Sequence, residues 1–223
     1  MVARPARAEP AGPTGPAGPA GPARGSVRTR LLDAAEELFY EQGLAATGVD
    51  AVLRRAHVAP ATLYAHFGGK DGLVAAYLRR RHERWRQVWD AALERAGDNA
   101  VERLLSVFDA LGALRGAQDA ARGCAFLGAA VEVVDPAHPA REWLQADTEL
   151  LTTVLRRLAV EAGAEDPVAL AAELLLLYDG LLAARARRAL APDPAFTAAT
   201  SLPAVRALAA GAVVRHLPER VGR

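Results

Sequence analysis

Apolar residues recur at helical spacing along most of the chain that follows residue 25. Within residues 26–42 they lie at positions i, i+4, i+7 and i+8, which places them on one side of a helix. Ser26 is suited to cap the start of this helix, and Gly43 to end it with a positive φ. Runs of β-branched residues are rare and no strand pattern is found, so an all-α fold is predicted. The apolar stripe consists of Leu31, Ala35, Leu38 and Phe39.

Two short helices and a long one are predicted next, over residues 49–56, 60–66 and 70–95. Pro60 suits the first position of a helix, where its missing N–H costs nothing, and the Gly68-Gly69 pair ends that helix. Two short helices joined by a turn of three or four residues form the outline of a helix-turn-helix. His57 stands in the turn, where glycine is usual, and is tolerated there with some strain. Further helices are expected at 100–114, 124–133, 138–162, 167–190 and 201–217.

Residues 1–25 have a different composition, rich in Gly, Pro and Ala, with Gly at every third position from 12 to 21. So few triplets cannot hold a collagen triple helix, and a disordered, partly polyproline-II tail is expected. The tail arginines could touch DNA phosphates, or the tail could be an extension without a role.

Charge is distributed unevenly along the chain. Residues 1–86 hold 13 Lys and Arg against 8 Asp and Glu, whereas residues 87–223 hold 14 against 18. A basic N-terminal part favours a partner such as nucleic acid, although chance composition would also explain so modest an excess.

Several classes of protein are disfavoured by the residues present. The single cysteine, Cys124, permits no intramolecular disulfide and no Cys-based zinc site, and the histidines form no convincing metal site. No nucleophile–base set or phosphate loop is recognised, so neither an enzyme nor a cofactor is predicted. Because the sequence offers no signal peptide and no stretch of 18 uncharged apolar residues, a cytoplasmic protein without a membrane span is expected.

The third predicted helix carries the candidate chemistry. Leu63 and Phe67, four residues apart, should point inward, so small residues face outward and allow close approach to a DNA major groove. Side chains around this helix can donate hydrogen bonds to phosphate oxygens. Taken singly, each of them also fits plain packing or a solvated surface. The outward residues are Ala61, Thr62 and Ala65, and the donors are Thr62, Tyr64, His66 and Lys70.

The run RTRLLDAAEELFYEQGLAATGVDAVLRRAHVAPATLYAHFGGKDGLVAAYL resembles the DNA-binding domain of the TetR family of bacterial transcriptional regulators. The resemblance implies a homodimer that places two recognition helices in successive major grooves of a near-palindromic double-stranded DNA operator. It also implies backbone contacts by Thr47 and by the tyrosine, histidine and lysine, and base contacts by the outer positions of the third helix. The predicted DNA-binding residues are Arg28, Thr47, Pro60, Ala61, Thr62, Tyr64, His66 and Lys70.

The sequence departs from the family pattern at Leu53, His57 and Ala59, where a small residue, Gly, and Ser or Thr are usual. Ala59 cannot cap the third helix with a side-chain oxygen, a loss of about 1 kcal/mol that Pro60 offsets in part. Because Pro60 and Ala61 offer no side-chain donor, base readout should depend on thymine methyl contacts and DNA shape.

A ligand cavity is expected among the helices of the C-terminal part. Residues 123–144 resemble a segment of one branch of the family whose ligand is unassigned, and an apolar cavity there would suit a small apolar or aromatic effector. Core packing is the alternative for the tryptophans, and a buried, inert thiol is the alternative to redox sensing for the cysteine. The predicted ligand-binding residues are Trp85, Trp89, Phe108, Cys124, Phe126, Trp143 and Tyr178.

The helix over residues 167–190 is apolar almost all round near Leu174–Leu177, so it needs a partner on a second face. With the last helix it could form a four-helix bundle across a two-fold axis, where Gly180 and Gly211 permit close approach. The alternative is a central helix buried within one subunit.

These observations predict a disordered tail at 1–25, a helix-turn-helix domain at 26–72, and a helical effector-binding and dimerisation domain at 73–223. The predicted function is a dimeric, ligand-responsive transcriptional repressor in which the fourth helix links effector to DNA. An activator, a DNA-binding protein without a ligand, and a helical interaction scaffold remain as alternatives.

Overall fold

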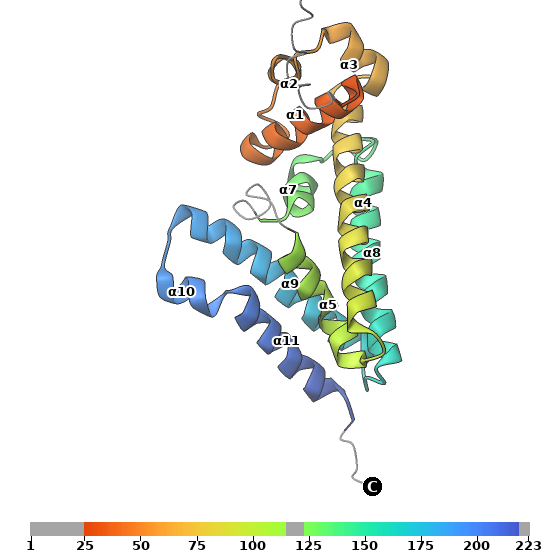
Figure 1. Cartoon of the computed structure of the whole chain (residues 1–223), viewed down its shortest axis with the longest axis vertical. Helices are drawn as coiled ribbons and strands as arrows, with labels where there is room; N and C mark the ends of the chain where they lie inside the picture. Colours follow the sequence, from red (N-terminus) through yellow and green to blue (C-terminus); the bar gives the residue numbers. More distant parts are fainter. Residues whose placement is uncertain (1–24, 115–122, 219–223) are drawn as a thin grey trace, which may run out of the picture.

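The structure is a computed structural model that describes residues 25–114 and 123–218, and these residues form helices without strands (Figure 1). The N-terminal helices sit at one end of the molecule, and the long α4 runs from them into the body. α8 lies alongside α4, while α9 and α11 cross the body obliquely and are joined by the short α10. The helices are α1 (Val27–Gln42), α2 (Val49–Ala56), α3 (Pro60–Phe67), α4 (Lys70–Ala96), α5 (Ala100–Ala113), α7 (Ala125–Glu132), α8 (Arg141–Glu161), α9 (Pro167–Leu190), α10 (Pro194–Ala199) and α11 (Leu202–His216).

Side-chain caps fix many of the helix starts. The Ser26 hydroxyl accepts a hydrogen bond from the amide of Thr29 at 3.2 Å, and Asp166 does the same for the first turn of α9. Proline follows the cap in several helices, including α3 and α9, and its fixed φ suits the first helical turn. Because each of these residues lies next to the helix that it begins, the sequence pattern alone predicts the helix starts to within a few residues.

Two apolar clusters organise the fold. One joins α1, α2, α3 and the first turns of α4, with contributions from α7. The other joins the rest of α4 with α5, α8, α9 and α11. α4 contributes Leu78 to the first cluster and Trp85 to the second, so one unbroken helix connects both cores.

One expected helix bound is wrong, and one short helix was not predicted. α8 begins at Arg141 rather than near His138, because the ring Nδ1 of His138 accepts the Ala140 amide at 3.0 Å and holds a turn. The short α10 was not predicted, although Asp193 caps it and Pro194 occupies its first position. The predicted tail lies outside the described residues.

α9 is also long and apolar enough to cross a membrane by length and composition alone. Of that apolar window 39% is buried within the protein, and Glu173 on the same helix pairs with Arg215 and His216 of α11. These contacts favour a helix of the protein core whose remaining apolar surface needs a partner.

Candidate nucleic-acid interface

α3 is held by its neighbours on one side and exposed on the other. Leu63 is fully buried, and the ring of Phe67 packs beneath the guanidinium of Arg28, 5.2 Å from the ring centroid. Tyr64 has an exposed fraction of 57%, a high value for so large an apolar side chain. An eight-residue helix cannot persist alone, so these inward contacts fix the direction of the outer face. That face carries Ala61, Tyr64, Ala65 and His66, with Thr62 half-buried at its margin.

The turn between α2 and α3 has the geometry that a helix-turn-helix needs. His57 adopts φ 54° and ψ 53°, and it is the only described residue other than glycine with a positive φ. Its amide donates to the carbonyl of Arg54 at 3.3 Å, and the amide of Val58 donates to Leu53 at 3.1 Å. The left-handed residue thus closes α2 and lets α3 leave in a new direction.

The start of α3 lacks a side-chain cap, as the sequence predicts. Ala59 precedes Pro60 and no side chain accepts from the first amides of α3. Pro60 has no N–H, and the amide of Thr62 donates to the backbone carbonyl of Ala59 at 3.1 Å.

Lys70 lies at the first position of α4, directly after Gly68 and Gly69. Its Nζ donates to the carbonyl of Ala45, in the loop between α1 and α2, at 3.3 Å. The ammonium is thereby held beside the loop between α1 and α2, and Lys70 itself follows the C-terminal end of α3 by three residues.

Thr47 does not fit its predicted role. The residue is fully buried, and its hydroxyl lies 2.7 Å from the carbonyl oxygen of Gly43 and 3.2 Å from that of Leu38. The side chain thus closes the loop after α1 instead of facing solvent. We therefore leave Thr47 out of the candidate interface.

The basic excess that was counted over residues 1–86 does not lie in the helix-turn-helix region. Residues 26–72 hold five basic and six acidic side chains. Arginines of α4 and α2 neutralise several of the acids on α1, as in the pairs Arg80–Asp33 and Arg55–Glu37, both at 2.7 Å. The basic residues are Arg28, Arg30, Arg54, Arg55 and Lys70, and the acidic ones are Asp33, Glu36, Glu37, Glu41, Asp50 and Asp71.

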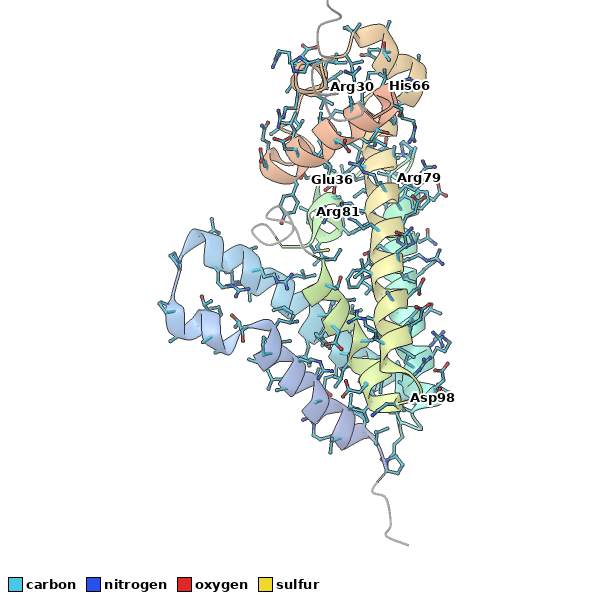
Figure 2. All side chains as sticks on the ribbon, viewed as in Figure 1. Arg30, Glu36, His66, Arg79, Arg81 and Asp98 are labelled. Atoms are coloured by element: carbon cyan, nitrogen blue, oxygen red, sulfur yellow. The ribbon has the colours of Figure 1, made fainter. Side chains whose placement is uncertain are left out.

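Glu36 links α1 to α4 through charged side chains. It is buried, with an exposed fraction of 8%, and its carboxylate pairs with Arg80, Arg81 and Arg84. Figure 2 shows Glu36 and Arg81 meeting just below α1. Sequence reasoning missed this cluster, because nothing in a helical pattern says which long-range partner a carboxylate on α1 will meet.

Glu132 makes a second link that sequence reasoning missed. At the end of α7, its carboxylate accepts the amide of Leu44 at 3.2 Å and that of Ala45 at 2.5 Å. The body of the protein therefore holds the loop between α1 and α2 by a charged acceptor.

A cavity in the body gathers four of the seven residues predicted to bind a ligand, namely Trp85, Cys124, Phe126 and Tyr178. The other three lie elsewhere. Trp89 is a core residue that donates to the hydroxyl of Ser106 at 2.9 Å, and Phe108 is fully buried in the same core. Trp143 packs against His82, with ring centroids 5.9 Å apart.

Burial raises the pKa of two titratable groups near the cavity. Desolvation raises the pKa of Cys124 to about 11, so its thiol is protonated at neutral pH. Desolvation also raises the pKa of Asp147, which lines the same cavity, although His82 and Arg81 oppose that shift. A protonated thiol is a weak nucleophile, which disfavours redox sensing by Cys124.

The N-terminal part of the chain is similar in sequence to known proteins. The family described as bacterial regulatory proteins, tetR family, matches residues 31–77. The HTH-type transcriptional regulator UidR of Escherichia coli is 39% identical over 57 residues. That match covers 26% of this chain and 29% of UidR, so it concerns the DNA-binding part alone.

Solved structures extend the similarity to the body. A TetR-family transcriptional regulator of Streptomyces coelicolor is 31% identical, with a TM-score of 0.73 over 86% of this chain and 96% of that one. A second protein, from Streptomyces avermitilis, is described as a tetR transcriptional regulator. It is 33% identical, with a TM-score of 0.62 over 84% of this chain and 98% of that one.

Proposed function

The chain belongs to the TetR family of bacterial regulatory proteins and is a DNA-binding transcriptional regulator, and we propose that it is a repressor that binds a near-palindromic operator as a homodimer. A small effector with a large apolar part would bind in the body and weaken operator affinity. Such a regulator acts in the cytoplasm, where it meets DNA.

The outer face of α3 is the observation that supports this proposal most. Tyr64 and His66 project from a helix whose other side is anchored by Leu63. The small side chains of Ala61 and Ala65 let the helix backbone come close to base edges. Arg28, over the ring of Phe67, and Lys70, at the start of α4, both lie near the C-terminal end of α3 and supply positive charge for phosphates.

Apolar surface on α9 and α11 supports the homodimer. Leu176 of α9 has an exposed fraction of 73% and Leu208 of α11 one of 59%, although both are leucines on body helices. Apart from its own helix backbone, no atom of the described residues lies within 4 Å of the place that a Cβ at Gly180 would take, so another helix could approach it closely. A second copy of the chain would cover this surface across a two-fold axis.

The two apolar clusters support a division of the chain into a DNA-binding part and an effector-binding part. Residues 26–72 supply most of the first, and the helices after residue 73 build the second. α4 belongs to both, so a change at the cavity that shifts α4 would reach α3 through a rigid element.

The proposal is tested by gel shift on the intergenic DNA beside the gene, with a random duplex as competitor. We expect one specific complex whose affinity falls steeply with salt. Lys70→Gln should lower the salt slope by about one unit, and Tyr64→Ala should weaken the complex by about tenfold.

Arg86→Gln is the matched control, because Arg86 is an exposed arginine on α4 away from α3 and its loss removes the same charge. It should leave both affinity and salt slope unchanged. Equal loss in Arg86→Gln and Lys70→Gln would point to a general charge effect and overturn the assigned face. Binding without preference for any sequence would overturn the operator proposal.

A further inference from the structure

Two arginines of α4 belong to two structures at once. Arg81 and Arg84 line the cavity in the body, and the same guanidinium groups pair with Glu36 of α1. Arg81 lies 3.3 Å from the Glu36 carboxylate and has an exposed side-chain fraction of only 12%. The cavity and the DNA-binding domain are therefore joined by the same two positive charges.

The cavity wall combines positive charge with aromatic surface. Arg185 of α9 is a third arginine on the wall, and the remaining lining is largely apolar. A positive wall beside aromatic rings complements a molecule with an aromatic body and an anionic group. The aromatic lining residues are Trp85, Phe126 and Tyr178.

An unsatisfied donor also points to a ligand. Trp85 has an exposed fraction of 5%, and its indole N–H has no hydrogen-bond acceptor among the described residues. A buried donor without an acceptor is costly, and an acceptor on a bound molecule would remove that cost. Trp85 lines the cavity one residue after Arg84, so one ligand could serve both.

Asp147 is the one acidic side chain among the described residues that line the cavity. It is buried, and burial raises the pKa of its carboxyl. The three arginines of the wall outnumber this single carboxyl. The free interior of the cavity is about 50 Å³, room for only a few water molecules. An aromatic occupant must therefore displace side chains of the wall.

Building on the proposed function, we propose that the effector is an aromatic organic anion, a carboxylate or sulfonate, whose charged group draws Arg81 and Arg84 away from Glu36. Glu36 then loses partners that hold α1 against α4, and the DNA-binding domain is freed to leave its DNA-competent position. No atom is transferred; the two arginines exchange one anionic partner for another.

A pair of fluorescent probes tests the charge requirement on the full-length protein without DNA. 1-Anilinonaphthalene-8-sulfonate has an anionic group, and N-phenyl-1-naphthylamine has the same rings without it. We expect the sulfonate to bind about tenfold or more tightly than the neutral amine. Equal or tighter binding of the amine, or no binding of either probe, would overturn the anion assignment.

Variants of both partners of the shared ion pair give opposite signs. Arg81→Gln and Arg84→Gln should each weaken sulfonate binding by about tenfold, because each removes one charge-assisted contact. Glu36→Gln should tighten it by about threefold or more, because the competing carboxylate is gone. Arg86→Gln, outside the cavity, should change nothing. Circular dichroism and thermal unfolding establish that each variant is folded, and weaker binding by a folded Glu36→Gln protein would contradict the exchange.

The link to DNA is measured separately. In the natural protein the sulfonate should lower operator affinity. In Glu36→Gln this effect should be smaller, because no Glu36 carboxylate is left for the sulfonate to displace. Since binding couplings are reciprocal, DNA should likewise weaken sulfonate binding less in that variant. Specific DNA binding without any preference for the sulfonate would sink only this inference. A protein that binds the sulfonate at the arginines but no DNA would sink the proposed function and leave the cavity assignment standing.

Discussion

Glu132 of α7 accepts the backbone amide of Ala45 at 2.5 Å, although 87 residues separate them. Ala45 lies in the loop that leads from α1 to α2, and Lys70 donates to its carbonyl. The peptide groups of Ala45 are thus held by the Glu132 carboxylate of α7 and by the Lys70 ammonium of α4. α7 and α4 are thus both anchored to the loop that precedes α2.

Replacement of Glu132 by alanine should loosen this loop. The amides of Leu44 and Ala45 would lose a charged acceptor, and we expect a loss of about 1–2 kcal/mol in the free energy that opposes their opening. Native-state hydrogen exchange at these two amides measures that change. Glu165→Ala removes an exposed carboxylate at the far end of the body and is the control. Unchanged protection in Glu132→Ala would mean that the loop holds itself.

A cap at the start of α3 should stabilise the protein. Ala59 precedes Pro60 and gives the first turn no side-chain acceptor, so Ala59→Ser is expected to raise the free energy of unfolding by about 1 kcal/mol. Chemical denaturation measures it, with Ala61→Ser as a control that adds the same hydroxyl inside the helix. Equal effects of both substitutions would show that the gain is not a cap.

Local chemistry made the N-terminal fold predictable. The bounds of α1 and α2, the inward direction of Leu63 and the left-handed His57 all follow from periodicity and the residue types at helix ends. The same signals failed at residues 138–140, where a side-chain-to-backbone hydrogen bond of His138 favours a turn over an early start of α8.

Long-range partners were beyond the sequence. Thr47 was assigned to DNA through the family resemblance, whereas its hydroxyl is used by the carbonyl of Gly43. The pairing of Glu36 with Arg81 and Arg84, 45 and 48 residues further along the chain, has no periodic signature, and it depends on the angle at which α1 meets α4. The cavity lining was also beyond the sequence. Trp85 and Trp89 share one face of α4, but only Trp85 lines the cavity.

The proposed dimer surface can be tested by introducing one charge. Leu176→Glu places a carboxylate at a position with an exposed fraction of 73% in one subunit, so the fold should survive while the dimer dissociates. Sedimentation velocity should show a monomer for this variant and a dimer for the natural protein. Val131→Glu changes a residue of α7 with an exposed fraction of 79% and should remain dimeric. A dimer that tolerates Leu176→Glu would place the interface elsewhere.

Cys124 should react slowly with thiol reagents. Because burial raises the pKa of Cys124 to about 11, very little thiolate exists at pH 8. We expect its alkylation at pH 8 to be about a hundredfold slower than that of free cysteine, whose pKa is about 8.5. The rate should rise with pH up to about 11, as the thiol ionises. Fast alkylation at pH 7, or loss of DNA binding after mild peroxide treatment, would restore a sensing role.

The most direct test of the exposed α3 face is cleavage of DNA from α3 itself. Cys124 is the only cysteine of the chain, so Cys124→Ser provides a background in which Ala65→Cys can carry a tethered iron–EDTA group. With the specific DNA bound, the account predicts two groups of cuts about one helical repeat, or roughly 34 Å, apart. A probe at Glu149→Cys on α8 should cut little. Cuts from the α8 probe with none from the α3 probe would contradict the account.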